Sequence, residues 1–120
     1  MITFTMDRKI IYYENENGRR FVKEFIDSLA PKVQEKVHWS LKLLRETPVL
    51  KRPYFARLQN SDGILEVIID SGSNTFRILF FLDGGNIVIL THGFMKKTEK
   101  TPKDEITKAE NYKKDYLKRK

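Results

Sequence analysis

Cysteine is absent from the sequence, and histidine occurs only twice, at His38 and His92. Without a thiol the chain can form no disulfide, hold no thiolate-bound metal and use no cysteine nucleophile. The two imidazoles fall in different predicted elements, which leaves too few ligands for a zinc site. We therefore expect a protein that needs neither a metal nor another cofactor, with His38 packed or at the surface beside Trp39.

The sequence also lacks the motifs with which other proteins handle nucleotides. It has no phosphate-cradling glycine loop, no paired carboxylates at metal spacing and no serine elbow. The sequence therefore lacks the residues that nucleotide hydrolysis and two-metal nuclease chemistry require. The remaining phosphoryl chemistry needs no metal: RNA supplies its 2′-hydroxyl as the nucleophile, and cations of the protein stabilise the crowded phosphate.

Long apolar runs are missing too, and those present are too short to span a bilayer. Residues 1–8 contain no basic segment followed by an apolar core, so we expect no secretion signal and a cytoplasmic location. With 120 residues, 40% of them apolar and 32% charged, the chain fits one globular domain over residues 1–120.

Positive charge is what the sequence has in excess. Lysine and arginine number 23 against 16 acidic residues, which gives a formal net charge of +7. This balance favours a polyanionic partner, either nucleic acid or an acidic protein, because neutralising phosphates releases counterions. Many small basic proteins are merely soluble, and composition leaves that reading open.

The first part of the chain predicts one strand and two helices. Residues 8–13, RKIIYY, have the composition of a short strand. Apolar residues then recur at helical spacing over residues 19–29, with Asn17 as the candidate cap. Pro31 begins a second helix, which stops before Pro48. Two amphipathic helices joined by a tight break predict a helical hairpin.

Four β-branched or aromatic runs follow, over residues 55–59, 64–70, 75–82 and 86–92. The turns between them, NSDG, SGSN and DGG, are of the kind that joins antiparallel neighbours. The last strand is predicted to end at His92, with an abrupt turn at His92 and Gly93. A small antiparallel or mixed sheet with the helical hairpin over one face is the α+β class.

A final helix is predicted after the strands. Thr101 is its expected hydroxyl cap, Pro102 lies in the first turn, and Asp104 is three residues past the cap. The apolar stripe of this helix faces either the core or a partner, and consists of Ile106, Ala109, Tyr112 and Tyr116.

Arg77 interrupts an otherwise apolar stretch of sheet. Strand alternation places it on the side of Leu79 and Phe81. A guanidinium in such a place is costly unless a carboxylate or a phosphate accepts its hydrogen bonds. The residue types leave two readings open, an ion pair with Glu66 of the neighbouring strand or a phosphate-binding role.

Other candidate residues lie at strand ends. His92 could act as a general acid or base at neutral pH, or be structural. Lys96 and Lys97 are either a solvated charge run or a clamp for phosphate oxygens just past the sheet edge. Arg57 could complete a ring of cations around one phosphate.

The strands ILEVIID, FRILFF and IVILTHGFMKKTEKTP, with Arg57 before them and the helix EITKAENY after them, resemble the RelE/HigB superfamily of type II toxins. Within it, they resemble the phage-related HigB-like branch, over roughly residues 8–117. The resemblance implies a RelE-like fold and a metal-independent endoribonuclease that cuts messenger RNA in the ribosome and so inhibits translation. It also implies a helix-turn-helix antitoxin as partner, with operator DNA bound only through that antitoxin.

The resemblance also implies roles for single residues. Arg77 matches the strand arginine that stabilises the scissile phosphate. Lys96 and Lys97 match the basic pair after the last strand, and Arg57 stands where the family often has lysine. His92 falls at the strand end, where acid or base residues occur.

Phe94 and Glu66 are the expected substrate-binding residues, with Phe94 placed for base stacking. Two departures accompany them. Ile68 stands where related toxins commonly have arginine two residues after the glutamate, and no catalytic tyrosine can be assigned, since Tyr112 and Tyr116 lie well along the final helix. A catalytically weak RelE-fold protein that acts with an antitoxin on DNA or RNA is the alternative, and a generic basic binding domain is a third hypothesis.

Overall fold

The computed structural model describes residues 7–120. Most of the segment in which the sequence shows no secretion signal, residues 1–6, lies outside the described residues. None of the helices in the described part is both long and apolar enough to cross a membrane. Along the chain the elements are β1 (Lys9–Tyr12), α1 (Phe21–Asp27), α2 (Pro31–Glu46), β2 (Phe55–Arg57), β3 (Leu65–Ser71), β4 (Asn74–Leu82), β5 (Ile87–Lys96) and α3 (Lys103–Arg119).

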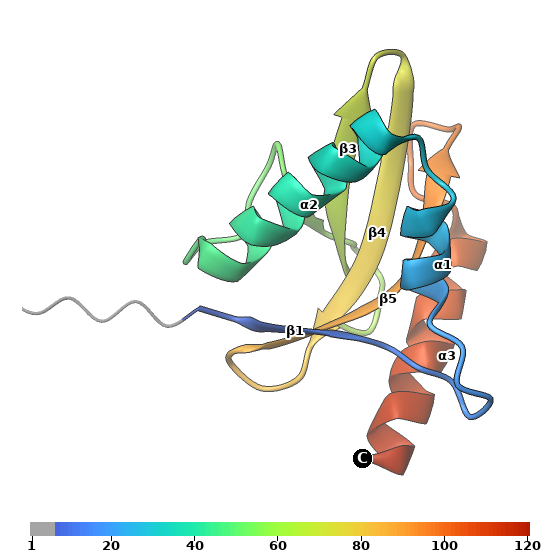
Figure 1. Ribbon diagram of the computed structural model, residues 1–120. Coiled ribbons are helices and arrows are strands. Elements are labelled where there is room, and N and C mark those ends of the chain that lie inside the picture. The colour runs from blue at the N-terminus through green and yellow to red at the C-terminus, as the bar shows by residue number, and fades with distance from the viewer. Residues whose placement is uncertain (1–6) are drawn as a thin grey trace, which may run out of the picture.

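The strands form one five-stranded mixed sheet in the order β1-β5-β4-β3-β2 (Figure 1). Strands β2 to β5 are joined as an antiparallel meander, and β1 pairs in parallel with β5 at the sheet edge. The predicted α+β class is confirmed, with helices before and after the meander. The parallel edge strand is what makes the sheet mixed.

The helical hairpin of α1 and α2 covers one face of the sheet (Figure 1). Pro31 is the first residue of α2, and α2 ends before Pro48, both as predicted. The predicted cap Asn17 is wrong: α1 begins at Phe21 without a side-chain cap. The side chain of Asn15 instead accepts hydrogen bonds from the backbone N–H groups of Asn17 and Arg19, so the polar turn closes on itself before the helix starts.

Helix α3 packs against the opposite face, over β4 and β5. Ala109 is fully buried there, so the apolar stripe of α3 faces the core and not a partner. Thr101 does not cap α3; its hydroxyl donates a 2.6 Å hydrogen bond to Oε1 of Glu66, and Pro102 takes the cap position. Thr101, which was predicted as a helix cap, therefore donates its hydrogen bond to a buried carboxylate of the sheet.

A β-bulge at Thr91 determines which side chains of β5 face α3. Leu79 pairs with His92 and Phe80 with Leu90, which leaves Thr91 as the additional residue. Its hydroxyl donates a 3.0 Å hydrogen bond to the carbonyl of Leu79. Because the bulge shifts the alternation by one, the even-numbered residues from 92 to 96 lie on the side of the sheet that α3 covers.

The predicted strand end at His92 is consequently wrong, because β5 continues through Lys96. Gly93, where the turn was expected, pairs with Ile78 and faces α1. A Cβ atom at this position would overlap the ring of Phe25 of α1. Glycine is needed here because the hairpin packs closely on the sheet, and not because the chain turns.

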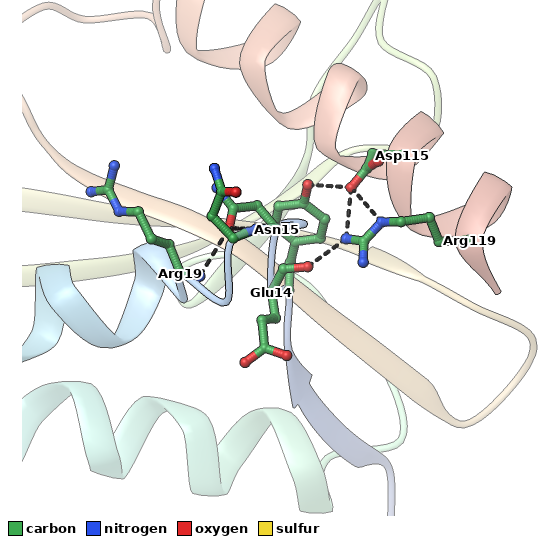
Figure 2. A network of polar contacts seen from close by, with 7 residues as sticks. Glu14, Asn15, Arg19, Asp115 and Arg119 are labelled. Carbon is green, nitrogen blue, oxygen red and sulfur yellow. Dashed lines mark hydrogen bonds and ion pairs between the residues drawn. The ribbon is translucent and has the colours of Figure 1, made fainter.

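The end of α3 is fastened to the loop after β1 (Figure 2). Tyr13 donates a 2.6 Å hydrogen bond to Asp115, and Arg119 contacts the same carboxylate and the backbone carbonyl of Glu14. Burial, followed by the hydrogen bond to Asp115, raises the pKa of Tyr13 to about 12. The final helix is thus held in place at the β1 edge.

Replacing Gly93 tests the close packing of α1 on β5. Gly93→Ala is expected to lower the free energy of unfolding by about 1 to 3 kcal/mol, because the added methyl group pushes Phe25 off the sheet. Urea denaturation measures the change. Gly85→Ala is the matched control, since a Cβ there meets nothing within 4 Å. Equal stability of the two variants would contradict this packing.

The pH dependence of stability tests the Tyr13 contact. Because the pKa of Tyr13 rises from 10.0 to about 12 on folding, its contribution to stability is complete below pH 10 and lost towards pH 12. The stability difference between wild type and Tyr13→Phe should therefore narrow over that range. Urea titrations at successive pH values measure it, and a difference independent of pH would rule out the contact.

Candidate functional site

A buried ion pair lies at the centre of the face opposite the hairpin. Arg77 of β4 pairs in register with Ile68 and Glu66 of β3 with Leu79, so the two charged residues are diagonal neighbours. Nε of Arg77 lies 3.3 Å from Oε1 of Glu66, and the residues are only 7% and 3% exposed. The predicted carboxylate partner of Arg77 is therefore present.

The pair leaves part of the hydrogen-bonding capacity of Arg77 unused. Its Nη1 donates a 3.1 Å hydrogen bond to the carbonyl of Phe76. Its Nε is buried without a hydrogen bond, because the N–H is not directed at the nearby carboxylate of Glu66. Thr101 donates to that carboxylate instead. Arg77 thus has a buried N–H group without a hydrogen bond, and its positive charge still acts on neighbouring groups.

A cleft of about 370 Å³ opens beside this pair. It lies where the end of β2, the end of β5 and the segment before α3 meet. Four cations face one another across it, together with the carboxylates of Glu66 and Glu99. A cleft lined mainly by one sign of charge concentrates counterions, so the chemistry it favours is that of an anion. The cationic residues are Arg52, Arg57, Lys96 and Lys100.

Lys96 is the cleft residue whose acid–base chemistry the structure changes. It ends β5, half-buried, on the same side of the sheet as Arg77. Burial, then the positive charges of Arg77 and Arg52, lower the pKa of Lys96, while Glu66 opposes the shift. Lys96 therefore gives up its proton more readily than an ordinary lysine, which suits it to proton transfer as well as to binding an anion.

His92 lies apart from the cleft, beneath α3. It is 5% exposed, and its Nε2 is 3.1 Å from Oε1 of Glu105, while its Nδ1 is 3.2 Å from the hydroxyl of Thr91. Burial lowers the pKa of His92, against the opposing effect of Glu105. Its ring contacts Tyr112 of α3 at a centroid distance of 5.6 Å. The structure therefore places His92 between α3 and the sheet.

Phe94 and Lys97 also lie outside the cleft lining. The ring of Phe94 stacks on His92 at a centroid distance of 5.9 Å and packs in the layer beneath α3. Lys97 follows β5 and is exposed. Of the predicted residues, Arg57, Glu66 and Lys96 line the cleft, and Arg77 adjoins it through its ion pair with Glu66 without lining it.

Three residues at the cleft were missed from the sequence. Arg52 lies in the loop before β2, Lys100 in the charged segment after β5, and Thr101 was interpreted as a cap. The run KKTEKT carried a signal, since its third lysine, Lys100, belongs to the same charged segment as Lys96 and Lys97. Nothing in the sequence around Arg52 pointed to the site.

The described residues offer no evident metal centre. Between residues 7 and 120, His, Asp and Glu side chains nowhere form a group of three that could hold a metal ion. The candidate site is a set of cations around one buried carboxylate, and its natural ligand is a phosphate or another anion.

Removing the carboxylate tests the buried pair. Glu66→Ala is expected to lower the free energy of unfolding by about 3 to 5 kcal/mol, because Arg77 is left buried without its partner. Urea denaturation measures the loss. The double variant Glu66→Leu with Arg77→Met should be less destabilised, since no lone charge remains. Glu99→Ala removes an exposed carboxylate of the same cleft and should change stability by less than about 0.5 kcal/mol.

Comparison with known proteins agrees with the resemblance seen in the sequence. The profile of the family described as "Phage derived protein Gp49-like" matches residues 24–114, about three quarters of the chain. This match includes α2, all of β2 to β5 and the cleft residues. No curated protein matched the chain. The chain therefore belongs to the phage-derived Gp49-like family, a type II toxin family related to the RelE/HigB-like toxins.

Proposed function

We propose that the protein is the toxin of a type II toxin-antitoxin system and a HigB-like endoribonuclease that cuts messenger RNA on the ribosome without a metal. The observation that carries this proposal is the cationic cleft beside the buried pair of Arg77 and Glu66, with Lys96 of lowered pKa in its lining. Such a site can bind a phosphate and move a proton, which are the two tasks that RNA cleavage requires.

The proposed reaction uses the RNA as its own nucleophile. The 2′-oxygen attacks the adjacent phosphorus, the bond from phosphorus to the 5′-oxygen breaks, and a cyclic phosphate and a free 5′-hydroxyl result. Lys96 in its neutral form accepts the proton of the 2′-hydroxyl, and a solvent molecule protonates the departing 5′-oxygen. Arg77 and Arg57 stabilise the negative charge that builds on the phosphate.

The remaining predicted residues have supporting roles in this proposal. Lys97 adds positive charge along the path of the RNA backbone. His92 and Phe94 act as positioning residues, because they join β5 to α3 and so fix the strand that ends in Lys96. Glu66 holds Arg77 in place through the ion pair.

The partners follow from the family and the proposed activity. A toxin of this class needs a cognate antitoxin, which we propose to be a helix-turn-helix protein that binds operator DNA on behalf of the pair. The messenger RNA and the ribosome are the proposed targets, and the cytoplasm is the proposed location. The proposed reaction uses neither a metal nor any other cofactor.

One observation favours the alternative of a catalytically weak binding protein with the same fold. Arg77 is almost fully buried against Glu66, and its neighbour across the sheet is Ile68, where related toxins commonly have a second arginine. The catalytic proposal thus depends on Arg52, Arg57 and Lys100 to provide the missing charge. An anion bound without cleavage is what this alternative predicts.

Induction of the protein in a bacterial host tests the proposal. Wild type should arrest growth and cleave messenger RNA in the host, and purified protein that has been stripped with EDTA and then freed of it should still cleave messenger RNA on purified ribosomes. Lys96→Met should lower the cleavage rate by roughly 10²- to 10⁴-fold, because it removes the proposed proton acceptor. End analysis of the RNA should show a cyclic phosphate and a 5′-hydroxyl. Lys118→Met, which removes an exposed lysine at the end of α3, is the matched control.

Two results would contradict the proposal in different ways. Cleavage that is unchanged in both Lys96→Met and Arg57→Met would show that the cleft is not the active site. RNA binding without cleavage by wild type would favour the weak binding protein, provided that growth arrest still requires the cleft.

A further inference from the structure

Two exposed aromatic side chains stand together beside the sheet. Trp39 of α2 and Tyr54, just before β2, have ring centroids 5.2 Å apart in an edge-to-face arrangement. They remain 52% and 42% exposed, although both are large apolar groups. Trp39 is also the only tryptophan of the chain. Packing of the core does not account for this pair.

The pair lies where the edge of the sheet is left open. Strand β2 is only three residues long, and the carbonyl of Tyr54 just before it accepts a 2.8 Å hydrogen bond from Ile68. Beyond Tyr54, none of residues 7–120 forms a strand beside β3 on that side. The carbonyl of Asp70 accepts a hydrogen bond from Nζ of Lys36 instead. Trp39 and Tyr54 border a hollow of about 500 Å³ at this edge.

This aromatic hollow adjoins the cationic cleft. Arg52 lines the cleft, and Tyr54, two residues later, lines the hollow, so their Cα atoms are at most about 7.6 Å apart. Ile68 lines the hollow and pairs in register with Arg77. The cleft lies on the face that α3 covers and Trp39 belongs to the hairpin on the other face, so one strand of RNA would reach both sites by passing over the open edge of the sheet.

Alternating phosphates and bases are a feature of single-stranded nucleic acid. Unpaired bases stack on aromatic side chains, while cations beside them contact the backbone. Lys36 at the hollow and Arg52 between the two sites provide cations on both sides of the rings. The hollow is also lined by Pro53, Ile68 and Ile69, so its apolar surface would suit a protein partner as well, and the cations of the neighbouring cleft are what favour RNA.

We infer that Trp39 and Tyr54 form a stacking platform for an unpaired base of RNA next to the phosphate bound in the cationic cleft. This inference rests on the proposed function and adds a second subsite to it. The platform is a binding subsite and takes no part in the chemical step. It holds one base in place while its neighbouring phosphate lies against the cations.

Intrinsic fluorescence tests the platform directly, because Trp39 is the sole tryptophan. The probe is a short single-stranded RNA with 2′-O-methyl groups, which cannot be cleaved through its 2′-oxygen. Titration should quench Trp39 fluorescence in wild type. A matched RNA with abasic positions keeps the phosphates but offers no base, so it should bind more weakly and leave the fluorescence unchanged.

Variants measure the contribution of each ring. Anisotropy of the labelled RNA should show binding that is roughly 5- to 150-fold weaker in Trp39→Ala and in Tyr54→Ala, the range reported by alanine substitution at base-stacking residues. Leu117→Ala is the control, since it removes an exposed apolar side chain from α3. Its affinity for the RNA should equal that of wild type.

The outcomes separate the platform from the proposed function. If wild type binds the RNA without quenching, and both alanine variants bind equally well, the platform is overturned while RNA cleavage at the cleft stands. If wild type neither binds nor cleaves RNA, the proposed function fails first and the platform with it. Quenching by a purified antitoxin but not by RNA would assign the rings to a protein partner and overturn the inference.

Discussion

The ion pair of Arg77 and Glu66 is the contact on which the organisation of the site depends. Two charges inside a sheet lose their hydration, and only their proximity and added hydrogen bonds offset that loss. The hydroxyl of Thr101 provides one such bond, and so the segment before α3 is drawn onto the sheet beside β3. One buried pair thus fixes the register of two strands, the start of α3 and the floor of the cleft.

The bulge at Thr91 gives this pair a neighbour of the same charge. Without the additional residue, the even-numbered side chains of β5 would continue on the hairpin face, where Val88 and Leu90 pack. With it, Lys96 comes to the side of Arg77, and Gly93 comes to the side of α1. The same irregularity therefore allows the hairpin to pack closely and brings a lysine to the cationic cleft.

Much of the fold could be predicted because it follows from local periodicity. The stripe of α2, its start at Pro31 and the pairing of Arg77 with a carboxylate of the next strand all follow from spacing along the chain. The bulge could not be predicted, since its hydrogen bond joins Thr91 to Leu79 of another strand. Thr101 was misread for a related reason: a hydroxyl before a helix caps it only if its oxygen faces the first N–H groups of the helix, and donation to the buried Glu66 turns Thr101 to the sheet instead.

The site was predicted less well than the fold, because burial and not residue type separates its members. His92 and Lys96 lie four residues apart on one strand and on one side of the sheet, yet α3 covers the first and leaves the second at the cleft. From the sequence alone, His92 and Lys96 are equally good candidates for the site. The contact of Tyr112 with the ring of His92, and the place of Lys96 in the cleft lining, show which of the two solvent can reach.

The buried charge of Arg77 affects both the stability of the sheet and the pKa of Lys96. Glu66 does not cancel the effect of Arg77 on Lys96, because the positive charge of Arg77 lowers the pKa of Lys96 more than the negative charge of Glu66 raises it. An anion entering the cleft opposes that effect, since negative charge beside an ammonium favours the protonated form. In the proposed reaction Lys96 has to be neutral while the phosphate is bound, so the positive charges of Arg77 and Arg52 have to outweigh the charge of the phosphate. The balance between these guanidinium groups and the phosphate therefore decides whether Lys96 acts as a base or as a clamp in that reaction.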